Sequence, residues 1–195
     1  MIGNDIVDLN LAKIQSNWQR KGFLMKVFTN SEQELIRGAS EPDQLVWRLW
    51  SMKESVYKAT LKNYKKIRLN PVRFECRLLD EKNGEVRFNG FHCFTISEMN
   101  EDYVHSVAYQ ESAPFKLHYK VTGEQPLCGK ELYQSVISYL TECFNWVPEG
   151  IFLQKNSLGI PEFYRFGKKI PVFCSLSHHG RYESYLIAAS NESIS

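Results

Sequence analysis

The chain lacks the marks of several large protein classes. No apolar run approaches the ~20 residues that span a bilayer, and no basic segment precedes an apolar one near the N-terminus, as in a secretory signal. Its five cysteines are scattered, without a CxxC pair or the Cys/His spacing of a zinc site. These absences predict a cytoplasmic protein that is not attached to a membrane and folds without disulfides or structural zinc.

The chain also lacks a large excess of positive or negative charge. The chain carries 24 Lys and Arg against 22 Asp and Glu, a net charge of +2, which is too even for nucleic-acid binding through bulk charge. At 195 residues it is long enough for one sizeable domain or two small ones that share an interface. We therefore expect no nucleic-acid partner, and an anionic ligand must be held by a local cluster of side chains.

Two helix-plus-strand patterns follow one another along the chain. The first has an initial strand, helical segments and four alternating strands, and the second, after a junction at 111–114, has a strand, a helix and four strands. We predict an α+β fold of two similar subdomains, each a helix packed on an antiparallel sheet, forming a pseudo-dimer with halves 1–111 and 112–195. The expected helices are 9–18, 29–38, 43–63 and 132–144, and the expected strands are 2–9, 72–78, 85–88, 91–96, 103–109, 115–121, 150–154, 161–165, 172–176 and 182–189. Asn83-Gly84 and Asn89-Gly90 are typical of hairpin turns.

Three carboxylates, Asp5, Asp8 and Glu54, stand in apolar surroundings. Acids in such places are usually paired or bound to a metal. Two of them also have a structural explanation, because Glu54 and Lys58 have the i,i+4 spacing of a helical ion pair and Asp8 precedes a helix that it can cap. The residues alone leave both explanations open.

A second polar cluster, Ser175-Leu-Ser-His-His-Gly180, follows an apolar strand. Ser177 and His178 are adjacent in sequence and no GxSxG elbow is present, which argues against a serine hydrolase. Hydroxyl, imidazole and backbone donors at a strand end suit a phosphate, although a single histidine is more often structural.

Five segments, taken in order, resemble the 4′-phosphopantetheinyl transferases. Gly3 to Leu9 is similar to their Gly-x-Asp-Ile-Val-Glu strand, and Trp50-Ser-Met-Lys-Glu-Ser-Val-Tyr-Lys58 to their W/F-x-x-K-E-[SA]-x-x-K signature. Phe23 to Glu32 resembles the stretch that follows the strand in the carrier-protein synthase branch. Asn156 to Pro161 and Cys174 to His178 are similar to the G-x-P and S-x-S-H coenzyme segments.

The resemblance implies a reaction and a role for each matching residue. The enzyme would transfer the phosphopantetheine arm of coenzyme A to a serine of an acyl or peptidyl carrier protein, in fatty-acid or polyketide synthesis, and release 3′,5′-ADP. It implies that Asp5, Glu54 and, directly or through water, Asp8 hold Mg²⁺, and that Glu54 or a water that it orients is the base. By the same resemblance Lys53 and Lys58 offset phosphate charge. Gly159, Pro161, Ser177 and His178 would bind the coenzyme.

This chain departs from the family pattern at two positions. Ile160 stands where the family's G-K-P segment has lysine, so that phosphate contact is missing, and Lys155, Arg165 or Lys168 could replace it. His179 replaces the usual serine after the S-x-S-H histidine. These departures motivate an alternative, a member that binds coenzyme A or a carrier without turnover. A second alternative is a metal-dependent phosphohydrolase that uses the three carboxylates.

The segment order is itself unusual. The coenzyme segments close the chain, as in the short trimeric branch, yet a four-strand meander follows the Lys-Glu helix, which that branch lacks. We expect the halves of the long monomeric enzyme joined in swapped order, and therefore a monomer.

Basic residues at Lys13, Arg20, Lys21 and Lys26 suit either an acidic carrier helix or an ordinary solvated helix face.

Overall fold

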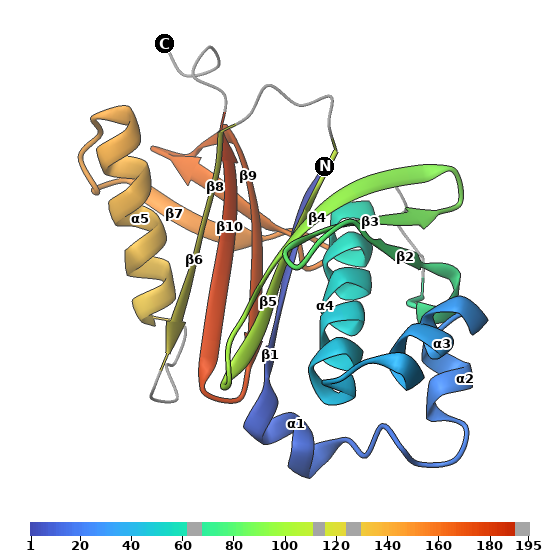
Figure 1. Ribbon diagram of the computed structural model, residues 1–195. Coiled ribbons are helices and arrows are strands. Elements are labelled where there is room, and N and C mark those ends of the chain that lie inside the picture. Colours follow the sequence, from blue (N-terminus) through green and yellow to red (C-terminus); the bar gives the residue numbers. More distant parts are fainter. Residues whose placement is uncertain (62–67, 111–115, 124–129, 190–195) are drawn as a thin grey trace.

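The computed structural model describes residues 1–61, 68–110, 116–123 and 130–189. These residues form an α+β fold with two antiparallel five-stranded sheets, each with helix packing (Figure 1). The predicted fold class, two similar subdomains in a pseudo-dimer, is confirmed. The predicted junction between the halves, at residues 111–114, lies outside the described residues.

The first half builds its sheet in the order β1-β5-β4-β3-β2. Its first strand is therefore an edge strand that pairs with its last, with Asp5 opposite Ser106. The elements of this half are β1 (Ile2–Asp8), α1 (Leu9–Gln15), α2 (Phe23–Val27), α3 (Asn30–Gly38), α4 (Pro42–Thr60), the 3₁₀ turn η1 (Pro71–Arg73), β2 (Glu75–Leu78), β3 (Asn83–Phe88), β4 (Phe91–Met99) and β5 (Tyr103–Tyr109).

The second half repeats this arrangement. Its sheet has the order β6-β10-β9-β8-β7, which is the order of the first sheet when strands are matched in sequence. In both halves the principal helix follows the first strand and precedes the meander. The elements are β6 (Lys116–Gly123), α5 (Lys130–Phe144), β7 (Ile151–Lys155), β8 (Pro161–Arg165), β9 (Lys168–His179) and β10 (Tyr182–Ala189).

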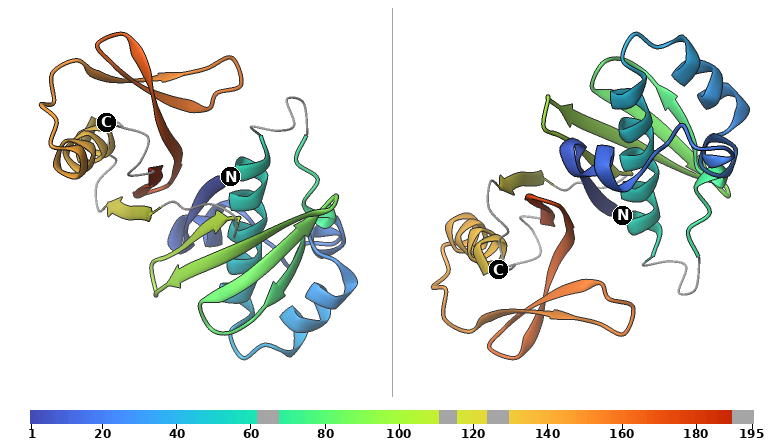
Figure 2. Two further views of the ribbon diagram at one scale, coloured as in Figure 1. Left: turned by 90° about the horizontal axis from the view of Figure 1, so that it is seen from above. Right: turned by 90° about the horizontal axis from the view of Figure 1, so that it is seen from below.

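Each half has its own apolar core. In the first, α4 buries Val46, Leu49, Met52 and Val56 against the sheet, which explains the helical spacing of these residues. In the second, α5 buries apolar side chains at Leu132, Val136 and Leu140. A third cluster, which contains Ile2, Val107, Leu186 and Ala188, lies between the two sheets. The halves therefore meet along β1 and β5 of the first half and β9 and β10 of the second, and they lie side by side (Figure 2).

Several local features differ from the sequence prediction. Asn83-Gly84 lies inside β3 rather than in a turn, because the Asp80 carboxylate accepts hydrogen bonds from the Lys82 and Asn83 backbone and closes the β2–β3 connection earlier. The Asn89-Gly90 turn is confirmed, and both residues have positive φ, 47° and 81°. Helix α1 ends at Gln15 instead of Trp18, and the short helix α2 was not predicted. No described helix is long and apolar enough to cross a membrane.

Candidate active site

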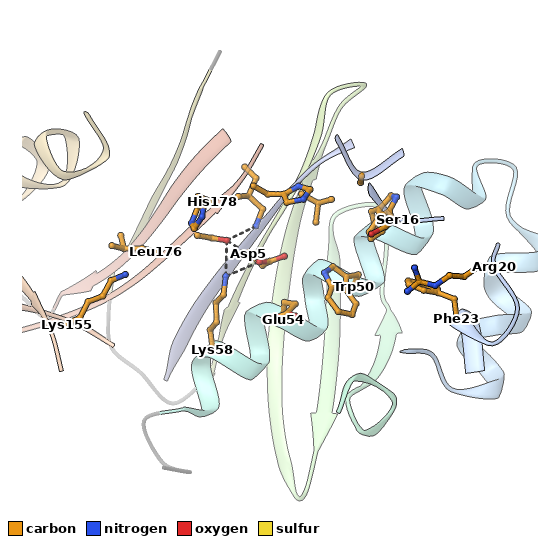
Figure 3. A pocket seen from close by; sticks show the side chains of 16 residues that line it. Asp5, Ser16, Arg20, Phe23, Trp50, Glu54, Lys58, Lys155, Leu176 and His178 are labelled. Atoms are coloured by element: carbon orange, nitrogen blue, oxygen red, sulfur yellow. Dashed lines mark hydrogen bonds and ion pairs between the residues drawn. The ribbon is translucent and has the colours of Figure 1, made fainter. Parts of the chain in front are cut away.

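A pocket of about 630 Å³ opens between the two halves (Figure 3). The first half contributes β1, the α1–α2 region and α4, and the second contributes the ends of β7 and β9. The polar side chains in its lining are Asp5, Ser16, Arg20, Glu54, Lys58, Lys155, Ser177, His178 and His179. The pocket therefore joins the two sequence clusters that were predicted separately.

Asp5, Lys58 and Ser177 form a closed triangle of hydrogen bonds on one side of the pocket. The Lys58 ammonium lies 2.9 Å from the Asp5 carboxylate and 2.9 Å from the Ser177 hydroxyl, which in turn donates to Asp5 over 3.1 Å. Figure 3 shows Lys58 reaching from α4 toward Asp5 on β1. Lys58 therefore pairs with the acid of another element rather than serving only as a helical partner of Glu54.

Glu54 lines the same pocket from α4. Burial and, second to it, the nearby Asp5 raise the pKa of this carboxyl, Lys58 lowers it, and together they bring it to about 7. Among the described residues no ion pair or hydrogen bond holds the Glu54 carboxylate. A half-neutral carboxyl beside a second acid is a group that can take up a proton near neutral pH or bind a cation.

Strand β1 approaches α4 at Gly3. A Cβ atom added at this position would overlap the Ser55 carbonyl oxygen and the Ala59 backbone nitrogen of α4. The Ser51 hydroxyl donates to the Asp5 carbonyl over 3.2 Å and fixes the strand at the same helix. The absence of a side chain at Gly3 thus allows Asp5 to come within reach of Glu54 and Lys58.

Asp8 does not line this pocket. Its side chain caps α1 through the Asn10 and Leu11 backbone and accepts hydrogen bonds from the Arg181 backbone and guanidinium, each over 3.0 Å. Burial alone would raise the pKa of Asp8, but the Arg181 hydrogen bonds lower it to about 2. The capping role that the sequence left open is confirmed, and the carboxylate joins the first half to the β9–β10 turn of the second.

Lys53 does not reach the pocket either. Its ammonium is fully buried, pairs with the Glu32 carboxylate at 2.7 Å and donates to the Pro71 and Phe74 carbonyls. Glu32 also accepts the Cys76 backbone N–H at 2.7 Å and completes the capping box of α3 with Thr29. The prediction that Lys53 offsets phosphate charge is corrected, because adjacent helical residues point about 100° apart and only Glu54 faces the pocket.

A family model describes the 4'-phosphopantetheinyl transferase superfamily and matches residues 1–108, more than half of the chain. The chain belongs to this superfamily. A search of curated proteins finds no significant match.

The matched range of the superfamily model includes Asp5, Glu54 and Lys58 but ends before the coenzyme segments. In the structure, the pocket is completed by Ser177 and His178 of β9 and by Lys155 of β7. The second half of the pocket is therefore built by a part of the chain that the family comparison does not reach.

The G-x-P segment lies beside the main pocket. Gly159, Ile160 and Pro161 line a smaller neighbouring cavity that also borders Lys58 and Leu176. Three cations were predicted to replace the family lysine at position 160: Lys155, Arg165 and Lys168. Lys155 lines the main pocket, whereas Arg165 and Lys168 do not, and the Arg165 guanidinium lies 4.6 Å from the Trp146 ring centroid. Lys155 is thus the candidate that reaches the site.

The opposite end of the pocket is apolar and was not predicted. It is lined by Ala12, Phe23, Trp47 and Trp50, with Arg20 at 5.0 Å from the Phe23 ring centroid. One signal in the sequence points to part of it, since Trp50, Glu54 and Lys58 are spaced at i, i+4 and i+8 and share one face of α4. The residues of α1 and α2 come from segments without a comparable pattern.

Proposed function

We propose that the protein transfers the 4′-phosphopantetheine group of coenzyme A to a serine of an apo carrier protein and releases 3′,5′-ADP. The observation that carries this proposal is the single pocket in which Asp5, Glu54 and Lys58 of the first half face Ser177 and His178 of the second. Superfamily membership supports the general reaction.

The side chains of the pocket fit a magnesium ion that arrives with the coenzyme. No group of three His, Cys, Asp or Glu side chains in the described part of the chain is arranged to hold a metal. Asp5 and Glu54 nevertheless supply two carboxylates, and Mg²⁺ commonly takes one or two carboxylates together with substrate phosphates and water. When bound, such an ion neutralises charge on the pyrophosphate oxygens. Asp8, held by Arg181, is left out of this set.

The remaining residues divide the chemistry between binding and proton transfer. Lys58, His178 and Lys155 would bind coenzyme phosphates from three elements around the pocket. Glu54, with its pKa raised to about 7, would accept the proton of the carrier serine directly or through one water. The serine oxygen then attacks the β-phosphate in line as the bond to the 3′,5′-ADP oxygen breaks.

The carrier would dock on the surface around α1 and α2. Lys13, Lys21 and Lys26 are exposed there beside two exposed apolar side chains, Ile14 at 83% and Met25 at 68%. A basic surface with apolar contacts fits an acidic amphipathic helix.

Because one chain supplies both halves of the pocket, we also propose a monomer, which sedimentation equilibrium tests.

The decisive experiment incubates the protein with coenzyme A, Mg²⁺ and a panel of apo carrier proteins. Mass spectrometry should show the phosphopantetheine mass on a carrier together with release of 3′,5′-ADP. Coenzyme binding without any mass shift would support the non-catalytic alternative, which the isoleucine at position 160 motivates. Phosphate or nucleotide release in the absence of a carrier would instead indicate a phosphohydrolase.

A further inference from the structure

The edge strand of the first sheet is bound by side chains of the second half. β1 pairs with β5 on one side only, so it has outward-facing backbone groups that no strand of its own sheet can bind. The N–H groups of Asn4, Ile6 and Asp8 donate to Ser175 Oγ, Ser177 Oγ and His179 Nδ1 over 3.1, 3.2 and 2.9 Å.

The three contacts have a common spacing. Each pair is separated by 171 residues, so alternate residues of β1 meet alternate residues of β9 in the same direction. Side chains two apart in a strand share one face, which explains why Ser175, Ser177 and His179 act together. We call these three residues the β9 acceptor row.

The middle member of the row has a second set of partners. A hydroxyl group has one donor and two acceptor positions. Ser177 Oγ accepts from the Ile6 N–H and from Lys58 Nζ at 2.9 Å, and it donates to Asp5 Oδ1 at 3.1 Å. All three positions are occupied by protein groups, and the residue is only 5% exposed.

We propose that Ser177 is a positioning residue that holds Asp5 and Lys58 at the pocket, and that it does not bind a coenzyme phosphate. A phosphate oxygen could take its proton only if the Asp5 carboxylate gave it up. This inference rests on the proposed transfer reaction and changes the role that the family resemblance implies for this serine. His178, which is exposed, is left as the phosphate-binding side chain of β9.

Ser175 offers a matched control. It is also buried, lies on the same strand face and accepts a β1 N–H, but it lines the cavity beside the G-x-P segment and not the main pocket. Ser175→Ala and Ser177→Ala therefore remove the same kind of interface hydrogen bond. Only Ser177→Ala also removes the hydrogen bonds to Asp5 and Lys58.

The test compares these variants with Ser177→Thr, which keeps the hydroxyl group. For Ser177→Ala we expect kcat to fall about 10- to 100-fold while the KM for coenzyme A changes less than threefold, and for Ser177→Thr and Ser175→Ala we expect kcat within about fivefold of wild type. Urea unfolding of all three variants checks that the fold is retained.

Calorimetric titration with coenzyme A alone supplies a readout without turnover. A dissociation constant for Ser177→Ala within threefold of wild type supports the positioning role, and a tenfold or greater weakening overturns it. Equal kcat losses in Ser175→Ala and Ser177→Ala would also overturn it, because the effect would then belong to the interface. If the wild-type protein transfers nothing, the proposed function fails, while the binding titration still decides whether Ser177 contacts the coenzyme.

Discussion

The Lys58 ammonium lies 2.9 Å from the Asp5 carboxylate, although 53 positions separate the two residues. This pair joins α4 to β1 at the point where the second half of the molecule also contributes a hydroxyl group. The ammonium therefore offsets the charge of the Asp5 carboxylate in the free protein. A bound coenzyme phosphate would compete with Asp5 for the same cation.

Glu54→Gln should abolish transfer and stabilise the fold. A carboxyl whose pKa rises from an ordinary 4.5 to about 7 on folding destabilises the folded state as the pH rises through this window. The variant should therefore be about 1–3 kcal/mol more stable than wild type at pH 8, and the difference should shrink toward zero by pH 4.5. Urea unfolding without coenzyme or metal measures it. A variant that unfolds earlier at pH 8, or that still transfers, contradicts this account.

Lys53→Met should cost about 3–5 kcal/mol of stability, because it leaves the buried Glu32 carboxylate without its cation. Replacing both members, as in Glu32→Met with Lys53→Met, should restore much of that loss, since a buried ion pair is often replaceable by apolar side chains. Urea midpoints of the two single variants and the double variant form the cycle. A loss in the double variant equal to the sum of the two single losses would contradict the ion pair, because additive losses mean that the two residues act independently.

Gly3→Ala should disrupt both stability and transfer. The added methyl group would overlap the Ser55 carbonyl oxygen, so β1 must move away from α4 at a cost of about 1–3 kcal/mol. Because Asp5 lies two residues further along the strand, we also expect a loss of about 100-fold in kcat/KM, as for a displacement of about 1 Å. Gly38→Ala is the matched control, since a Cβ there meets nothing within 4 Å. Similar behaviour of the two variants would refute the close-packing argument.

Much of the fold could be predicted because each helix or strand buries one face, and that face sets the spacing of the apolar residues in the sequence. The i, i+3 and i+4 apolar residues of α4 and the alternation of β2 to β5 follow directly from one buried face per element. Asn83-Gly84 was wrongly predicted to be a turn. Glycine also suits a strand position at which a Cβ atom would overlap a neighbouring side chain, here that of Met52. A tertiary contact, not the local pattern, decides between these two uses.

The site could be predicted in part for the same reason. Asp5, Glu54, Lys58, Ser177, His178 and Lys155 do meet at one pocket, but the sequence could not tell that Lys53 and Asp8 pair with Glu32 and Arg181 instead. Lys53 and Glu54 are adjacent, and only the rotation of α4 against β2 and α3 decides which one is buried. The partner of Asp8, Arg181, is 173 positions away and belongs to the other half.

The variant Asp8→Asn tests whether the Asp8 carboxylate is a metal ligand or has a structural role. Asparagine also caps helices well, so this change removes the ion pair with Arg181 while α1 keeps its cap. The pKa of Asp8, lowered to about 2, means that its ion pair stabilises the fold above pH 3.8 and that this contribution is lost as the pH falls through 2. We therefore expect the variant to lose about 1–3 kcal/mol at pH 7 and much less near pH 2.

The same variant should keep the wild-type magnesium dependence of transfer within about threefold, because the Asp8 carboxylate is held by Arg181 outside the pocket. Arg181→Ala removes the partner instead and should lose at least as much stability at pH 7, since it leaves a buried carboxylate unpaired. Urea unfolding at pH 2 and pH 7, together with a magnesium titration of the transfer rate, tests both residues. A tenfold rise in the magnesium requirement of Asp8→Asn, with stability unchanged, would contradict this account. It would show that the Asp8 carboxylate binds the metal and that its pair with Arg181 does not stabilise the fold.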